Sequence, residues 1–123
     1  MKRTAPLALA IALIASVAQA QTGMSVSQFL TTANGIPRNP TALLRPDTRR
    51  LMNEVKGAFA TVRREQNAAQ AAGRRSATCM PERTPISADA LLRRFNAIPA
   101  SRRNITVTQA VREWMAAEHP CPA

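Results

Sequence analysis

Apolar residues recur along this chain at three- and four-residue spacing, which is the spacing of one face of an α-helix. The longest such pattern begins at Pro46 and ends at Gly73, and proline in the first turn and glycine just past the last are typical helix boundaries. The apolar positions that mark its predicted buried face are Leu51, Val55, Ala58, Phe59 and Val62. Gly57 interrupts this pattern at a cost of about 1 kcal/mol relative to alanine, so we expect a second helix to approach closely there.

Three shorter helices are predicted from a shared start signal, an apolar residue followed by a serine or threonine cap. The caps are Ser25, Ser87 and Thr106, and the predicted helices span residues 26–34, 88–98 and 107–119. Gln28 and Gln109 lie three positions after their caps, so each is expected to close a capping box. Residues 41–44 are expected to form a short turn, and no strand pattern is present. The sequence therefore predicts an all-α fold, a compact four-helix domain with one additional short helix as an option.

The first twenty residues have the pattern of a secretory signal peptide. Lys2 and Arg3 precede an apolar stretch from Leu7 to Val17, and the small-x-small site 18–20 predicts cleavage after Ala20. The alternative is a membrane anchor, but the stretch is shorter than the roughly 20 apolar residues that a span needs. We therefore expect residues 1–20 to be removed, residues 21–123 to form a single helical domain without a membrane span, and the protein to be periplasmic.

Cys79 and Cys121 are the only two cysteines, 42 positions apart. An exported chain with an even number of cysteines usually pairs them, which predicts a disulfide bond. Loop-closure entropy assigns about 4 kcal/mol to a bond of this span. The alternatives are a Cys-His catalytic pair or a metal site that uses His119, the only histidine, although a tetrahedral metal site would lack a fourth ligand. His119 also suits a helix end, because Pro120 follows it.

Charge identifies the classes of partner that this chain could attract. Removing Lys2 and Arg3 lowers the formal net charge from +10 to +8, and such a field attracts acidic proteins, anionic lipid or nucleic acid. Export argues against nucleic acid, and so do the few aromatic residues, all on predicted core faces. On the long helix Arg49, Lys56 and Arg63 recur every seven residues and form a candidate interaction surface. The alternative is an ordinary solvated helix face.

The sequence contains no recognisable catalytic set. It has no serine-histidine motif and no glycine-rich phosphate loop, and its seven acidic residues are scattered. Glu113 and Glu118 could in principle form an acid pair, but five-residue spacing places them apart around a helix, so exposed solubilising residues are the better explanation. We therefore expect no enzymatic activity and no cofactor, which leaves a binding or structural role.

The segment from Cys79-Met80-Pro81 to Pro120-Cys121 resembles the C-terminal half of the Rap/Tai immunity proteins of type VI secretion. The residues within it that carry the resemblance are Ile86, Leu91-Leu92, Phe95, Ile98, Val107, Ala110-Val111 and Trp114. Upstream, Phe29-Leu30 and Gly57-Ala58-Phe59 resemble other recurring elements of that family. Some relatives carry a further cysteine near the first helix, where this chain has Ser25 or Ser27.

The resemblance implies an all-helical periplasmic protein, commonly a homodimer, that binds and blocks a peptidoglycan-hydrolysing amidase delivered by a neighbouring cell. The alternative function is a general periplasmic envelope protein of the same fold, without a toxin partner, whose basic surface meets anionic envelope components. An acid-activated chaperone is a weaker option, because few acidic residues and one histidine leave little to titrate.

Overall fold

The structure, a computed structural model, describes residues 23–122, so the predicted signal peptide lies outside the described residues. The elements are α1 (Val26–Asn34), η1 (Pro40–Leu44), α2 (Pro46–Ala71), α3 (Ala88–Asn96), η2 (Ala100–Arg102) and α4 (Val107–Glu118), where η denotes a short 3-10 helix. These described residues contain four α-helices and no strand, which confirms the all-α prediction. The predicted helix ends differ from the observed ones by no more than two residues.

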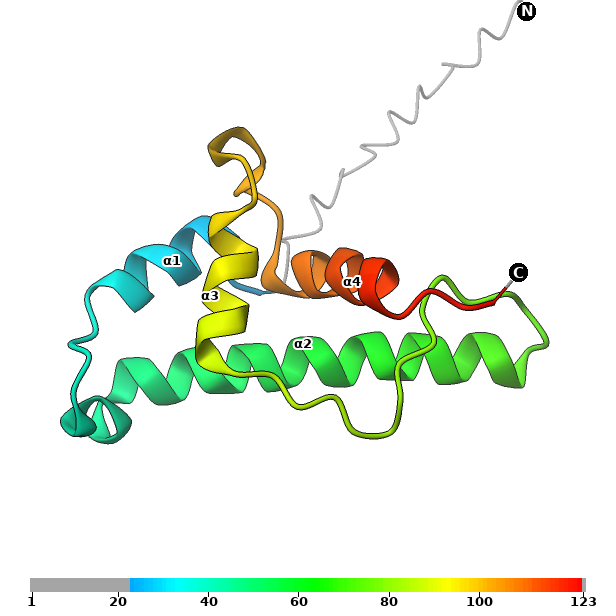
Figure 1. Cartoon of the computed structure of the whole chain (residues 1–123), viewed down its shortest axis with the longest axis horizontal. Helices are drawn as coiled ribbons and strands as arrows, with labels where there is room; N and C mark the ends of the chain where they lie inside the picture. Colours follow the sequence, from blue (N-terminus) through cyan, green and yellow to red (C-terminus); the bar gives the residue numbers. More distant parts are fainter. Residues whose placement is uncertain (1–22, 123) are drawn as a thin grey trace, which may run out of the picture.

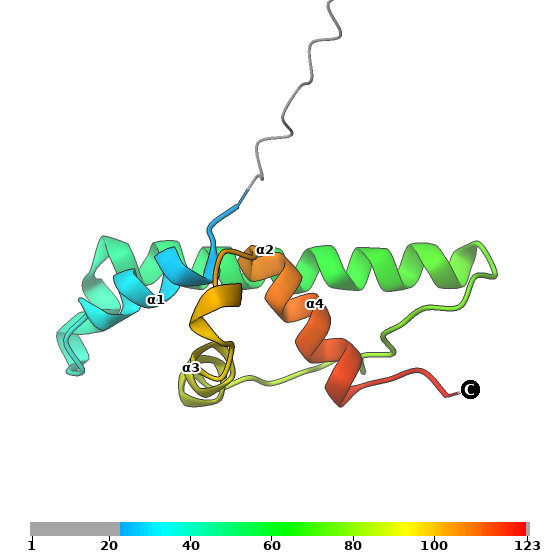
Figure 2. The same ribbon diagram turned by 90° about the horizontal axis from the view of Figure 1, so that it is seen from above.

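Helix α2 forms the long axis of the molecule (Figures 1 and 2). Pro46 occupies its first position, and Gly73 ends it with a positive φ of 66°. At this end the Arg74 amide donates to the Ala69 carbonyl at 2.8 Å and the Gly73 amide donates to the Gln70 carbonyl at 3.1 Å. These two bonds form a Schellman motif, which glycine favours because it adopts the left-handed conformation without strain.

Helices α1 and α4 begin side by side and satisfy each other's first amide. The Val26 amide donates to the Ile105 carbonyl, and the Val107 amide donates to the Met24 carbonyl, both at 2.9 Å. Ser25 and Thr106, the two N-caps, form an isolated antiparallel bridge between these bonds. Free amides at helix starts therefore obtain partners from a segment about 80 positions away in the chain.

The predicted capping boxes are formed to different extents. At α1 the box is complete, because Ser25 accepts from the Gln28 amide and the Gln28 side chain accepts from the Ser25 amide. At α4 the Thr106 hydroxyl accepts from the Gln109 amide at 3.0 Å, but the Gln109 side chain accepts instead from Arg112. The second box is therefore only half formed, because a neighbouring arginine competes for its glutamine.

All four α-helices contribute to one hydrophobic core. Helix α2 packs most extensively against α4, while α1 contacts α2, α3 and α4. Phe29 of α1 meets Phe95 of α3 edge to face, with ring centroids 5.2 Å apart, and Phe59 of α2 meets Trp114 of α4 at 6.2 Å. The few aromatic residues thus join pairs of helices in the core, as the sequence predicted.

The prediction that a second helix approaches closely at Gly57 is wrong. Gly57 is exposed, and a Cβ atom built there would have no neighbour within 4 Å. Its neighbour Ala58 is only 1% exposed, and successive helix positions are rotated by about 100° from each other. Gly57 therefore lies on the outward side of α2, where no other helix of residues 23–122 packs.

Candidate interaction surfaces

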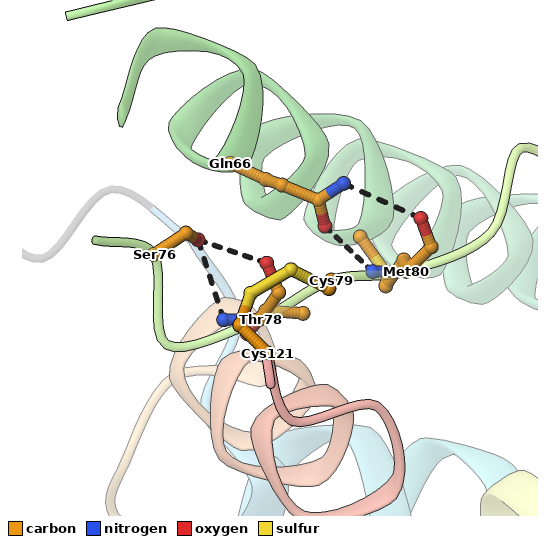
Figure 3. The surroundings of a disulfide bond; sticks show 6 residues. All are labelled: Gln66, Ser76, Thr78, Cys79, Met80 and Cys121. Carbon is orange, nitrogen blue, oxygen red and sulfur yellow. Dashed lines mark hydrogen bonds between the residues drawn. A yellow bond between two sulfur atoms is a disulfide. The ribbon is translucent and has the colours of Figure 1, made fainter. Parts of the chain in front are cut away.

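Cys79 and Cys121 form a disulfide bond, with their Cα atoms 4.9 Å apart, as predicted. The Cys79 amide also donates to the His119 carbonyl at 2.8 Å, and Thr78 and Pro120 form an antiparallel bridge. A covalent bond and a backbone hydrogen bond therefore hold the chain after α4 against the segment that leads to α3. Figure 3 shows this junction beside α2.

Gln66 of α2 binds both backbone groups of Met80, the residue after the first cysteine (Figure 3). Its side-chain oxygen accepts from the Met80 amide at 2.7 Å, and its nitrogen donates to the Met80 carbonyl at 3.3 Å. Gln66 and Met80 are only 6% and 5% exposed. A buried amide or carbonyl group without a hydrogen-bond partner is costly, so this pair of hydrogen bonds fixes the chain at Met80 to α2.

Gln66 was not among the residues predicted to have a role. Its position was nevertheless visible in the pattern, because Ala58, Val62 and Gln66 follow one another at four-residue spacing on the buried face. A polar residue that continues an apolar helical stripe is a candidate for a buried hydrogen-bonding role.

The three basic residues of the candidate interaction surface on α2, Arg49, Lys56 and Arg63, lie in two different environments. Arg49 and Lys56 are exposed. Arg63 is half-buried, and its guanidinium donates to the Pro81 carbonyl at 2.9 Å. Arg63 therefore holds the segment after the disulfide, whereas the role of Arg49 and Lys56 in an interaction remains a prediction.

Beside this fixed segment lies a groove of about 380 Å³, which we call the loop groove. Its lining comprises Pro81, Arg83, Thr84, Pro85, Ile86, Ala90, Trp114, Glu118 and His119. Trp114 is 4% exposed, and Arg83 and Glu118 are exposed. The groove therefore combines apolar lining with a cation, a carboxylate and an imidazole, a composition suited to a protruding polypeptide segment.

A second hollow of about 500 Å³ lies between α1 and α2. It is lined by Met24, Ser27, Gln28, Thr31, Thr32, Arg50 and Glu54. The Glu54 carboxylate accepts from the Met24 amide at 2.9 Å, so it holds the segment before α1 against α2. Glu54 thereby has a structural partner.

Two ion pairs involve arginine or glutamate side chains of α4. Arg112 forms a two-point contact with Glu65 of α2, with nitrogen-oxygen distances of 2.8 and 2.6 Å. The hydrogen bond from Arg112 lowers the pKa of Glu65, and the same bond raises the pKa of Arg112. Glu113 pairs with Arg102 at 2.9 Å, while Glu118 lines the loop groove. Glu113 and Glu118 therefore have separate surroundings.

His119 caps the end of α4, in agreement with its predicted structural role. Its amide donates to the Met115 carbonyl at 2.8 Å. Over residues 23–122 no group of three or more His, Cys, Asp or Glu residues is placed to hold a metal ion. Because both cysteines are in the disulfide, the alternatives that paired a cysteine with His119 lack a thiol in this oxidised form.

No helix in the described part of the chain has the length and apolar character needed to cross a membrane. The disulfide fits an oxidising compartment, where such bonds persist. Comparisons with known proteins found no matching family model, no matching curated protein and no matching solved structure.

Proposed function

We propose that this protein is a periplasmic inhibitor that neutralises a peptidoglycan-cleaving amidase by complex formation, with the loop groove as the surface that receives the amidase. One observation carries the proposal, the fixing of the segment that borders the groove. The disulfide holds it at Cys79, Gln66 holds it at Met80, and Arg63 holds it at Pro81. A surface that is already ordered loses little conformational freedom when a partner binds.

The composition of the groove supports a protein partner. Pro85 and the half-buried Ile86 provide apolar contact area, and Arg83 provides an exposed cation beside it. Interfaces of this kind combine an apolar centre with a polar rim. Since the predicted mature chain carries a formal charge of +8, an acidic partner surface would also be drawn toward it before contact.

Inhibition in this proposal occurs by obstruction. A protein that covers the substrate cleft of an amidase needs a complementary surface and no reactive group of its own. The proposed role therefore requires binding alone, in keeping with the expectation that this chain is not an enzyme.

Co-expression provides the direct test. The candidate partner is a small hydrolase encoded by a neighbouring gene, and both proteins are directed to the periplasm. We expect restored growth and a complex that survives size-exclusion chromatography. Continued lysis with both proteins well expressed would reject that pairing, and failure with every neighbouring hydrolase would favour the general envelope role.

A charge reversal then tests the groove within a confirmed complex. Arg83→Glu is expected to weaken binding by about tenfold or more, because it replaces the cation at the rim with a repelled charge. Arg74→Glu makes the same charge change on an exposed residue outside the groove lining, and it should weaken binding by less than about threefold, through the overall field alone. Equal losses in the two variants would place the contact elsewhere.

A further inference from the structure

The large apolar side chains that are exposed gather near the start of α2. Among the described residues they are Leu43, Leu44 and Met52, with exposed fractions of 71%, 75% and 47%. Leu43 and Leu44, which we call the leucine tip, belong to η1, and η1 lies at one end of the molecule in both views (Figures 1 and 2). Single exposed apolar residues are ordinary, whereas two adjacent exposed leucines form a contiguous apolar surface, and contiguous apolar surfaces are candidates for contact with a partner or a membrane.

The short helix that carries these leucines is held by its own hydrogen bonds. Asn39 caps it, since its side-chain oxygen accepts from the Thr41 amide at 3.1 Å. The Arg45 amide closes its other end by donating to the Ala42 carbonyl at 3.2 Å. Pro40 and Pro46 restrict the backbone on both sides. The local fold therefore presents the leucines outward, and no described contact draws them into the core.

Cations surround the leucine tip in the sequence. Arg38, Arg45, Arg49 and Arg50 lie within six positions of Leu43 or Leu44. Asp47 is the single acid in this stretch, and it pairs loosely with Arg45 at 3.7 Å. The ion pairs among residues 23–122 engage Arg45, Arg102 and Arg112, so Arg38 and Arg49 keep their charge available to an outside partner.

We propose that the leucine tip is a peripheral membrane-contact site for an anionic phospholipid surface. Leu43 and Leu44 would enter the boundary between headgroups and acyl chains, while Arg38 and Arg49 meet lipid phosphates. Apolar side chains flanked by arginine are the usual combination at such boundaries. The observations favour lipid over a protein partner, because leucine is under-represented among residues that dominate protein interfaces.

Membrane contact through the leucine tip is compatible with the proposed inhibitory role but does not depend on that role. The C-terminal end of the described chain, which includes Cys121, lies at the opposite end of the molecule in both views (Figures 1 and 2). A membrane held at η1 therefore leaves the disulfide end exposed. The site would serve an inhibitor and a general envelope protein equally.

Vesicle sedimentation with the purified exported protein tests the proposal. Vesicles of phosphatidylcholine alone are compared with vesicles that also contain phosphatidylglycerol, at low and high salt. We expect binding only to the anionic vesicles, and a loss of about tenfold or more in the variant L43S/L44S, because serine cannot replace the buried apolar area. R38Q/R49Q should lose a similar factor and most of the salt dependence.

R74Q/R75Q is the matched control for charge. It removes two cations just beyond the other end of α2, about 39 Å away for 26 residues at 1.5 Å each, and should lose less than about threefold because salt screens distant charges. Circular dichroism checks that each variant is folded. R38Q/R49Q tests the site separately if L43S/L44S does not fold.

Three results would overturn the proposal. Equal vesicle binding by L43S/L44S and the unmodified protein would mean that net charge alone attracts lipid. Equal binding to both kinds of vesicle, or to neither, would remove the anionic lipid. A dimer by light scattering that L43S/L44S converts to a monomer would show that a second copy covers the tip.

Discussion

The two ends of α2 hold their neighbouring segments in different ways. At the C-terminal end, side chains of α2 bind a distant segment directly, through Gln66 to Met80 and Arg63 to Pro81, and a disulfide completes the junction. At the N-terminal end, η1 is held by bonds within residues 39–45 and leaves two leucines exposed. The C-terminal end of α2 therefore stabilises the fold, whereas the N-terminal end has side chains available for contact with an outside partner.

Removing the disulfide should produce the largest effect. Cys79→Ser/Cys121→Ser is expected to lower the free energy of unfolding by about 4 kcal/mol, because the unfolded chain regains the freedom of a loop of 42 residues. Urea unfolding measures this change, and thiol titration of the unmodified protein without reductant should find no free thiol. Two titratable thiols in the native protein would contradict the junction itself.

Gln66→Leu should have the second largest effect. The substitution leaves the Met80 amide and carbonyl buried without partners, which is expected to cost about 2 kcal/mol. Gln70→Leu is the matched control, because Gln70 is exposed on the same helix, and it should change the free energy of unfolding by less than about 0.5 kcal/mol. Equal losses would mean that the Met80 contact contributes nothing specific.

The distance in sequence between interacting residues explains how much of this fold the sequence could predict. Helix starts were predictable because a cap such as Ser25 and its partner Gln28 lie three positions apart and interact locally. The disulfide was predictable from the presence of two cysteines behind a predicted export signal. The role of Gln66 depends on Met80, fourteen positions away, and no local signal pairs these two residues.

Spatial neighbours also account for what was wrong or incomplete. A glycine within a helix suggested that a second helix approaches closely there. Gly57 instead faces outward, because the adjacent residue Ala58 lies on the buried face of α2. The seven-residue spacing predicted an outward-facing row of Arg49, Lys56 and Arg63, and Arg49 and Lys56 are exposed whereas Arg63 is half-buried. The spacing did not reveal that the segment after the disulfide reaches Arg63. The leucine tip was missed because exposure of η1 depends on where the other helices pack.

Gly57→Ala tests whether the middle of α2, between the two ends, is exposed on its outward face. Alanine fits without a neighbour within 4 Å, so it should raise the free energy of unfolding by about 1 kcal/mol through its higher helix propensity. The same gain is expected in the Gln66→Leu background, because the two sites share no contact. A loss of stability would instead indicate that the outward face of α2 is covered in solution.

The Glu65–Arg112 pair should produce a small dependence on pH near the disulfide end. Arg112 lowers the folded-state pKa of Glu65, so the stabilisation is present above the unfolded pKa near 4.5 and is lost as pH falls through the folded value. The two side chains are 47% and 37% exposed, and solvent screening limits the effect to about 0.5 kcal/mol. Urea unfolding from neutral to acidic pH should show this contribution disappear in Glu65→Gln. Glu82→Gln, at an exposed carboxylate outside the described ion pairs, should retain it.

The smallest effect on stability is expected at the leucine tip. Leu43→Ser/Leu44→Ser removes two side chains that are mostly in water already, so the free energy of unfolding should change by less than about 0.5 kcal/mol. Leu51→Ser, on the buried face of the adjoining helix, provides the contrast and should cost several-fold more, because it loses apolar contacts and buries a hydroxyl. A large loss in the tip variant would show that the leucines are covered in the folded protein. A loss that grows with protein concentration would attribute that cover to a second copy, because only association makes stability depend on concentration.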